Sequence, residues 1–426
     1  MNTFLERVSL FLVLILATGA GIGVFVGQDS SGAATSGGQP VIQLLFGLFY
    51  IVFFVFVAVQ FKSAWPLILQ EKWIAALCIL AVISMLWSID STETLRKGLA
   101  ILGSSMVGLC IAIKYEPKQL LRIVATCLGV CAIASLVVAL FIPSIGVMPE
   151  GAWQGVFYLK NTLGRMMSLG VVCFALLAVE QRRYRMVSIA MIALCSVLLF
   201  MSKSITGVVV ALLMLLILAF RRALLWPIRR LAAFLIASGL VVGSLALWAY
   251  ESRDAILQAI GRESTLTGRL PLWHYVKQDI LLKPMLGYGF SAFWSGSEAA
   301  RIQAVITWDA PNAHNGFLEV LLGLGVVGLF FLVASLLANL IRSVRSIRER
   351  GDFEESFPFF FLVFLVLYSL TESSLLAVNS ILWMLYSANS YWLVRDRLRP
   401  ETVSDEETDS PNAGYSSVLQ SGPAVS

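Results

Sequence analysis

Long apolar runs separated by short polar connections fill most of the chain. A helix needs about 20 apolar residues to cross a hydrocarbon core about 30 Å thick. The third run holds Glu71 and Lys72 near its start, which leaves the entry of that helix open. The pattern predicts an all-α polytopic membrane protein with about 12 transmembrane helices. The candidate spans are 8–27, 41–61, 66–87, 98–113, 120–142, 163–179, 184–201, 205–220, 231–250, 316–340, 357–377 and 380–394.

Composition agrees with this pattern. Of the 426 residues, 58% are hydrophobic and 13% are charged, whereas about 25% of an average protein is charged. The deficit extends over the whole length, which excludes a soluble protein with a single anchor. The first apolar run follows a single Arg7 and lacks a small-residue cleavage site, so we expect a retained helix rather than a signal peptide. The chain has no basic block with interleaved aromatic residues, and nucleic-acid binding is not expected.

The six cysteines all fall in or at the edge of apolar runs, and the chain has no CxxC motif. Cysteine in such a setting behaves as a small apolar residue. We therefore expect neither disulfides nor a metal site, and no cofactor. The cysteines are Cys78, Cys110, Cys127, Cys131, Cys173 and Cys195.

Orientation follows from the connections, because Lys and Arg gather in cytoplasmic loops. Residues 28–40 carry neither, whereas alternate connections are rich in arginine. Both termini are therefore predicted to be cytoplasmic, in a multi-pass protein of the bacterial inner membrane. The arginine-rich connections hold Arg182, Arg183 and Arg185; Arg221, Arg222, Arg229 and Arg230; Arg342, Arg345, Arg348 and Arg350; and Arg395, Arg397 and Arg399.

This orientation divides the chain into four parts. The last part is acidic and then rich in Ser, Gly and Pro, which predicts a disordered cytoplasmic tail. The parts are residues 1–250 with helices one to nine, a periplasmic loop at 251–315, residues 316–399 with the last three helices, and the tail at 400–426.

The loop leading into the tenth span contains both histidines of the protein. Residues 270–283 have an apolar spacing that predicts an amphipathic helix lying on the membrane. Pro284 should end this helix, and the glycines at 287 and 289 permit a tight turn. Asn315 is a predicted N-cap for the tenth span. The apolar positions are Leu270, Trp273, Val276, Ile280 and Leu281.

His314 would then stand directly before a helix N-terminus. The positive end of a helix disfavours imidazolium, and a neutral imidazole can accept a proton as a general base. The same helix end attracts an anion. The alternative is a histidine that only forms a hydrogen bond at the helix entry. For His274, beside Trp273, a structural role is the favoured interpretation.

Four cations fall on the side of the membrane where the charge rule expects few. They are Lys160, Arg165, Lys203 and Arg269. The apolar runs flanking Lys203 have 16 residues each and reach only about 24 Å. Either the two helices include flanking residues, or the turn lies below the membrane surface, where a lysine needs water or an anion. The alternative to a functional role is a lysine side chain that snorkels to the interface. Cations at a membrane face suit a lipid pyrophosphate, whose departure needs charge neutralisation. Glu372 on the same side could orient a sugar, pair with a basic residue, or be a solvated loop charge.

Several motifs together resemble the O-antigen ligase / polysaccharide polymerase superfamily, over about residues 150–330. The upstream motifs resemble those of exopolysaccharide repeat-unit (Wzy-type) polymerases most. The upstream motifs are Lys160-Asn161-Thr162-Leu163-Gly164 and Ser202-Lys203-Ser204-Ile205-Thr206-Gly207. The other motifs are Thr267-Gly268-Arg269 with Leu272-Trp273, Lys283-Pro284-Met285-Leu286-Gly287-Tyr288-Gly289, Ala313-His314-Asn315-Gly316-Phe317-Leu318-Glu319, and Gly323-Leu324-Gly325-Val326-Val327-Gly328.

This resemblance implies a GT-C-like membrane fold with one large periplasmic helical loop. It implies a metal-independent, inverting glycosyltransferase that polymerises undecaprenyl-pyrophosphate-linked repeat units, with a flippase and a chain-length regulator as partners. His314 resembles the family's catalytic base, and Arg269 resembles the arginine that holds the donor pyrophosphate. Lys203 stands where many relatives carry arginine, which keeps the charge but loses bidentate geometry. Lys160 is a weaker correspondence.

Two other functions remain open at this point. A ligase would use the same chemistry to transfer finished polymer onto lipid A–core. A lipid-linked oligosaccharide flippase or another transporter would belong to a different class, and transporters often show paired halves and broken helices. We see neither feature in the sequence.

Overall fold

The computed structural model describes residues 3–21, 39–251, 269–306, 310–351, 353 and 355–398. The predictions for the connection at 28–40, for Thr267 and Gly268, and for the tail at 400–426 lie outside these ranges, apart from residues 39 and 40. Within them the chain is helical, and the sole extended pairing is an isolated bridge between Val147 and Trp153. The expected all-α architecture is confirmed for this part of the protein.

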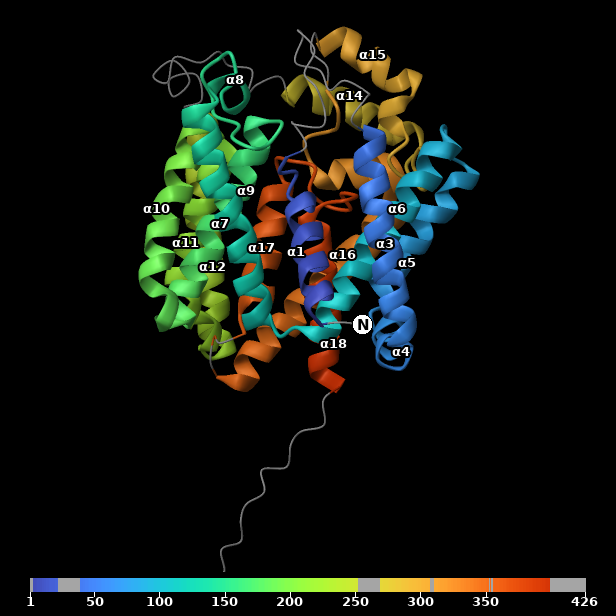
Figure 1. Cartoon of the computed structure of the whole chain (residues 1–426). Coiled ribbons are helices and arrows are strands. Elements are labelled where there is room, and N and C mark those ends of the chain that lie inside the picture. The colour runs from blue at the N-terminus through green and yellow to red at the C-terminus, as the bar shows by residue number, and fades with distance from the viewer. Residues whose placement is uncertain are drawn as a thin grey trace, which may run out of the picture.

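Most of the helices run roughly side by side (Figure 1), and each predicted apolar run overlaps a helix. The first nine are α1 (Thr3–Ala17), α3 (Gln39–Val59), α4 (Phe61–Gln70), α5 (Lys72–Ile83), α6 (Ser91–Lys114), α7 (Pro117–Phe141), α8 (Pro143–Gly146), α9 (Lys160–Glu180) and α10 (Arg185–Met201). The others are α11 (Ile205–Ala219), α12 (Ile228–Glu251), α14 (Arg269–Leu282), α15 (Ser297–Ile306), α16 (Gly316–Arg350), α17 (Phe357–Ser369) and α18 (Ile381–Leu398).

Helix length and apolarity fit a protein that crosses the membrane several times. In the described ranges, 6 helices are long and apolar enough to cross a bilayer, or up to 7 if a bent pair counts as one span. Helices α11 and α17 are apolar but shorter. The larger total of twelve spans stays a prediction, as does the periplasmic position of the large loop.

The third predicted span is not one straight helix. α4 and α5 meet at Glu71 with a bend of 87°, and Glu71 itself has non-helical torsions. Its carboxylate is fully buried and forms an ion pair with Arg342 of α16. A buried charge needs such a partner, so we attribute the break to the position that this ion pair imposes on Glu71.

The eleventh predicted span, 357–377, is also too long. α17 ends at Ser369, and the chain then forms an irregular segment up to Ser380. Leu376 and Asn379 in this segment have left-handed backbone torsions. Those torsions cannot continue a right-handed helix. The polar residues of this segment, Glu372 among them, therefore follow the end of α17 instead of continuing it as a helix.

α16 has a break at Gly325, whose φ of 64° and ψ of −163° are not helical. The turn after α14 pairs with this break: Tyr288 N–H donates to Leu322 O at 2.8 Å, and Val326 N–H donates to Pro284 O at 2.8 Å. A Cβ at Gly325 would overlap the carbonyl oxygen of Met285. The predicted tight turn is present, since Gly287 and Gly289 both have positive φ, and it is fastened to α16.

The helix predicted at 270–283 is present as α14, and it ends before Pro284 as expected. Its expected apolar face is partly wrong. Leu270 and Leu281 are 50% and 76% exposed, whereas Leu272 and Asp279 are buried. α14 packs against α15 and α16, and Arg301 of α15 compensates the buried Asp279 with contacts of 2.6 and 2.8 Å. The face that α14 buries is therefore determined by its packing against α15 and α16 rather than by a membrane surface.

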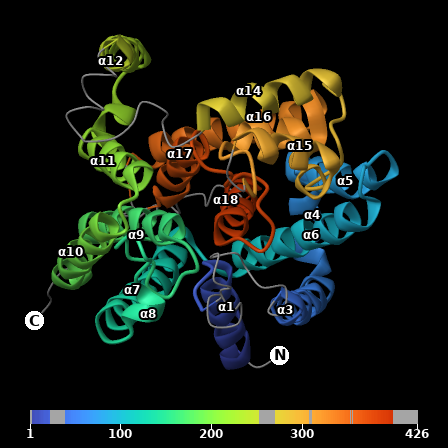
Figure 2. The ribbon, with the colours of Figure 1, turned by 90° about the horizontal axis from the view of Figure 1, so that it is seen from above.

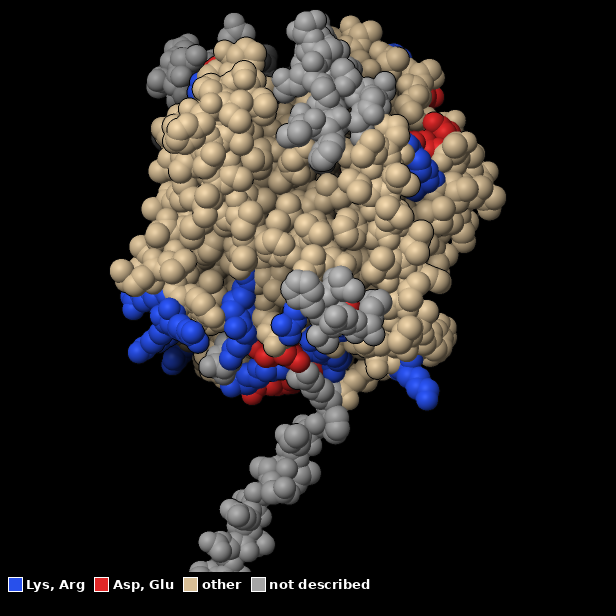
Figure 3. All heavy atoms as spheres, viewed as in Figure 1, with Lys and Arg blue, Asp and Glu red and all other residues tan. Residues whose placement is uncertain are grey.

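Charge is distributed unevenly along the long axis of the molecule. Lys and Arg gather at the end where α4 and the last turn of α18 lie, and the middle of the visible face is almost free of charge (Figure 3). The N-terminus lies at this basic end in Figure 1, while α14 and α15 lie at the opposite end. The cytoplasmic position of the basic end stays a prediction.

Candidate active site

His314 stands at the end of the molecule that carries α14 and α15. Asn315 caps α16, because its Oδ1 accepts hydrogen bonds from the N–H groups of Phe317 and Leu318 at 3.0 and 3.1 Å. His314 precedes this cap with a φ of 47°. Its own N–H donates to Asn312 Oδ1 at 2.9 Å. The predicted cap is thus present, and a local side-chain bond helps to maintain an unusual backbone conformation at His314.

Two more contacts fix the residue before His314. Trp273 Nε1–H donates to the Ala313 carbonyl at 2.8 Å, and Glu319 Oε2 accepts the Ala313 N–H at 2.9 Å. The other oxygen of Glu319 accepts from Trp294 Nε1–H at 2.9 Å. α14, α16 and the chain leading to α15 therefore all hold the backbone next to His314.

Glu372 is the carboxylate around which the site is assembled. Its Oε2 lies 3.1 Å from His314 Nδ1, and its Oε1 accepts from Arg269 Nη2 at 2.6 Å. Asn161 Nδ2, at the start of α9, lies 3.5 Å from the same Oε1. The Glu372 side chain is only 12% exposed. Three segments far apart in the sequence thus meet at one carboxylate, which sequence analysis had left with three alternative roles.

The charges around Glu372 determine its ionisation. Burial raises the pKa of Glu372, but the hydrogen bond and charge of His314 and the charges of Arg269 and Arg165 outweigh burial and hold its pKa below the ordinary value. An ionised carboxylate can only accept hydrogen bonds. His314 Nδ1–H then donates to Glu372 in both the charged and the neutral ring, and in the neutral ring the basic lone pair lies on Nε2.

Arg165 extends this group along α9. Its Nη1 lies 3.5 Å from Ser374 Oγ, two residues beyond Glu372. Its Nε is buried and has no hydrogen-bond partner within the described ranges. Buried polar groups are nearly always paired in native proteins, so this guanidinium N–H is an exception within the described ranges.

Lys160 and Lys203 form a neighbouring group around Glu150. Lys160 Nζ lies 3.0 Å from Glu150 Oε1, and Lys203 Nζ donates to the Glu150 carbonyl oxygen at 2.9 Å. Lys203 has a left-handed φ of 54°. The chain from Pro143 to Phe157 folds over its turn, where Trp153 N–H donates to Met201 O at 2.9 Å.

A side-chain contact and two consecutive residues connect the Glu372 group to the Glu150 group. Thr206 Oγ1, in the first turn of α11, lies 3.3 Å from Thr371 Oγ1 next to Glu372. Lys160 and Asn161 are consecutive residues, with Lys160 at Glu150 and Asn161 at Glu372. The predicted residues are thus gathered at one end of the bundle, in two adjacent groups. Together the groups contain four cations and two carboxylates, an excess of positive charge.

Sequence analysis missed several residues that shape this site. Asn161 and Glu319 stood inside the quoted motifs without an assigned role, and Asn312 and Glu150 were not singled out. The signal available for Glu319 was its place one turn after the Asn315 cap, where a side chain can reach back over the helix entry. Glu150 offered no comparable signal, because its contacts are with residues of other elements.

Other polar residues of the same end are structural. His274 is exposed and its Nε2 lies 3.1 Å from Gln278 on its own helix. Asp90 caps α6 by accepting from Glu93 N–H at 2.9 Å. No group of three or more His, Cys, Asp or Glu that could hold a metal occurs within the described ranges, and the six cysteines are all buried as free thiols.

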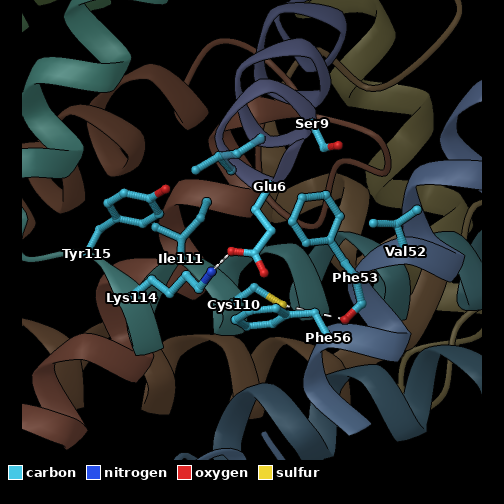
Figure 4. Close-up of a pocket in the computed structure, with 10 residues that line it drawn as sticks. Glu6, Ser9, Val52, Phe53, Phe56, Cys110, Ile111, Lys114 and Tyr115 are labelled. Atoms are coloured by element: carbon cyan, nitrogen blue, oxygen red, sulfur yellow. Dashed lines mark hydrogen bonds and ion pairs between the residues drawn. The ribbon is translucent and has the colours of Figure 1, made fainter. Parts of the chain in front are cut away.

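A small pocket lies between α1, α3 and α6, and His314 is not part of its lining. Glu6 and Lys114 point toward each other there, beside Phe53, Phe56 and Cys110 (Figure 4). Lys114 is the last residue of α6, whose first turn lies at the opposite end near the loop. The pocket measures about 20 Å³, room for about one water molecule. We interpret the ion pair as a structural contact of the basic end.

Helices of membrane-spanning length define a multi-pass membrane protein, and a histidine–carboxylate pair beside several cations at one end gives it a candidate reactive site. Residues 188–333 match the family described as O-antigen ligase. The chain is also 27% identical over 342 residues to the exopolysaccharide production protein ExoQ of Rhizobium meliloti (strain 1021), covering 76% of each chain. The predicted relation to the O-antigen ligase / polysaccharide polymerase superfamily is thereby confirmed. The chain is thus a multi-pass membrane protein that is similar to this polysaccharide-related ligase and polymerase group.

The family match can be compared with the site. It includes Lys203, Arg269 and His314, but it begins after Lys160 and ends before Glu372. The carboxylate that binds His314 therefore comes from outside the matched range, and the structure supplies this contact.

Proposed function

We propose that the protein is a membrane glycosyltransferase that polymerises undecaprenyl-pyrophosphate-linked oligosaccharide repeat units into exopolysaccharide or O-antigen on the periplasmic side. The observation that carries the proposal is the His314–Glu372–Arg269 cluster, in which a histidine oriented by an ionised carboxylate stands beside guanidinium groups. The likeness to an exopolysaccharide production protein supports the polymerase form.

In this proposal the cations hold the donor pyrophosphate. Arg269 and Arg165 offer planar guanidinium groups, which match phosphate oxygens in bidentate geometry. Lys203 and Lys160 add point charges from the neighbouring group. Their present partners are Glu372, Ser374 and Glu150, so phosphate would share or replace these contacts, and the excess of positive charge favours an anion.

The chemical step is a direct displacement at the anomeric carbon of the donor glycan. A hydroxyl of the acceptor unit forms the new C–O bond while the bond from C1 to the pyrophosphate oxygen breaks. The hydroxyl proton passes to His314 Nε2, the pyrophosphate keeps the bonding electron pair, and Arg269 and its neighbours neutralise the charge. Attack opposite the leaving group inverts the anomeric centre, and no metal takes part.

Glu372 acts on this step through His314. Its carboxylate keeps the Nδ1 proton in place and favours the imidazolium that forms when Nε2 accepts the acceptor proton. This makes Glu372 a positioning residue rather than a catalytic one. Asn161 and Arg269 in turn orient the carboxylate.

The proposal is tested by turnover of purified protein with lipid-linked repeat units. We expect His314→Ala and Arg269→Ala to insert normally and to lose polymer formation, by at least about 10²-fold. His274→Ala is the matched control, because this exposed histidine belongs to the same loop but does not contact the site. If both site variants make polymer at the control rate, the catalytic assignment is wrong.

A second candidate is a ligase that transfers finished polymer onto lipid A–core, because the matched family is described as O-antigen ligase. A glycan gel from a deletion strain distinguishes the two. Loss of all chains longer than one repeat supports the polymerase, whereas intact polymer retained on its carrier lipid supports the ligase. A flippase would form no glycosidic bond in the purified assay.

A further inference from the structure

A cavity of about 280 Å³ lies next to the segment that carries His314. This volume falls at the lower end of small-molecule pockets. Polar groups from four separate segments line it, and Phe290, Leu324 and Leu376 add apolar wall. The polar lining residues are Lys97, Ser291, Asn312, Glu319 and Ser373.

Two residues that line the cavity bind the backbone at the proposed base, although His314 itself is not part of the lining. Asn312 accepts the His314 N–H, and Glu319 accepts the N–H of Ala313. Ser373 directly follows Glu372 in the chain. A molecule bound in the cavity would therefore touch the residues that hold both His314 and its carboxylate.

The cavity and three of the four cations of the proposed pyrophosphate site belong to different helices. Lys160, Arg165 and Lys203 belong to α9 and to the turn before α11, whereas the cavity is formed by α6, α16 and the segments next to them. Seen from above, α9, α10 and α11 stand on one side of α17 and α18, and α6 and α16 stand on the other (Figure 2). A transfer reaction needs separate places for donor and acceptor, and these two groups of helices provide them.

The charge of the cavity differs from that of the cation groups. Lys97 lies 3.7 Å from Glu93, and the Glu319 carboxylate lines the same cavity. No net positive charge remains to attract a phosphate. Hydroxyl, amide, ammonium and carboxylate groups next to apolar wall suit a hydroxyl-rich ligand, and Ser373 Oγ is buried without a hydrogen-bond partner in the described ranges.

The backbone around the cavity is unusual as well. Ser291 and Leu376, both in its lining, have φ values of 57° and 50°. Non-glycine residues rarely adopt this region, and such residues gather at ligand sites, where the surrounding structure maintains them. The two residues belong to different segments of the cavity lining.

We propose that this cavity is the acceptor subsite, which binds the terminal sugar of the incoming repeat unit and directs its hydroxyl toward His314. The inference rests on the proposed function, because it assigns one of the two substrates of that reaction. The ligand class is a hydroxyl-rich saccharide rather than a pyrophosphate.

The test measures binding without turnover. Full-length His314→Ala protein in nanodiscs is titrated with the lipid-free repeat-unit oligosaccharide, released from the polysaccharide of the producing strain, and binding is followed by saturation-transfer NMR. We expect binding, and we expect Ala377→Trp, which fills the cavity from its lining, to abolish it. Ala300→Trp, an exposed position on α15, is the control and should bind normally.

Lys97→Met provides a second test that changes no large volume. We expect it to weaken binding by up to about tenfold through loss of a hydrogen-bond donor. Arg96→Met removes a neighbouring α6 cation that also pairs with Glu93 but does not line the cavity, and it should have no effect. Equal binding by Ala377→Trp and Ala300→Trp, or no binding by any variant, would overturn the subsite.

Failure of the subsite is separable from failure of the proposed function. The oligosaccharide titration does not depend on catalysis, whereas polymer formation by the wild type and its loss in His314→Ala do. Normal polymer formation without oligosaccharide binding rejects only the cavity. Polymer formation that survives His314→Ala rejects the mechanism.

Discussion

At the residue scale, the contact between His314 and Glu372 gives the site its chemical character. A neutral histidine can carry its proton on either ring nitrogen, whereas the ionised Glu372 favours the tautomer with the proton on Nδ1. The two residues are 58 positions apart in the chain. No local spacing could have paired them, although the Asn315 cap that places His314 could be predicted from its neighbours.

The same limit applies to the rest of the candidate site. Sequence analysis predicted that these residues lie on one side of the membrane, by counting charges against the orientation rule, and the structure places them at one end of the bundle. It could not show that Asn161 reaches Glu372 across 211 positions, or that Lys203 and Lys160 share Glu150 rather than Glu372. Such contacts depend on how helices pack, which one-dimensional patterns do not contain.

A substitution at Glu372 has a predictable pH dependence. The folded-state pKa of Glu372 lies below its ordinary value of 4.5, so its contribution to stability is complete above that value and is lost as the pH falls through the folded-state pKa. We expect Glu372→Gln to lower the unfolding temperature in detergent at neutral pH, because the variant loses about 3 kcal/mol of stability. The difference from the wild type should shrink below about pH 4.5.

Asp279→Asn is the matched control for Glu372→Gln. Asp279 also pairs with an arginine, but burial raises its pKa, so the difference between wild type and variant should change with pH in the opposite direction. Polymer formation per folded molecule should fall about 10²-fold in Glu372→Gln and stay unchanged in Asp279→Asn. Equal rates in both variants would show that Glu372 only stabilises the fold.

At the scale of elements, the break in α16 connects the loop to the membrane helices. The turn that holds Gly287 and Gly289 pairs with the backbone around Gly325, so the loop is attached to the same helix that Asn315 caps. Sequence patterns gave the turn and the cap correctly, because both depend on a few adjacent residues. They left the helix entry at Glu71 open but did not predict the break there, where Glu71 pairs with a residue 271 positions away.

Gly325→Ala should therefore destabilise the protein. Gly325 has a positive φ, and an added Cβ would overlap the Met285 carbonyl oxygen, so we expect a loss of at least about 2 kcal/mol. Gly323→Ala is the control, since its Cβ would meet nothing closer than 3.5 Å. Thermal unfolding in detergent compares the two, and similar unfolding temperatures would contradict the proposed attachment.

At the scale of the whole molecule, the basic end and the His314 end define an orientation that labelling can test. All six native cysteines are buried, so single added cysteines give a clear signal. We expect a membrane-impermeant maleimide to label Ala300→Cys in intact spheroplasts. Arg345→Cys, on an exposed position of the basic end, should react only after permeabilisation, and the reverse pattern would invert the topology.

The shortness of α11 has a consequence for the surrounding lipid. Its 15 residues span about 22 Å, less than the roughly 30 Å of a typical hydrocarbon core, and an embedded helix of this length favours a thinner bilayer around it. The carrier lipid would then meet Lys203 with its headgroup drawn toward the midplane. We expect polymer formation in vesicles of short-chain phospholipids to exceed that in long-chain ones. Turnover that does not vary with acyl-chain length would show that hydrophobic mismatch plays no part.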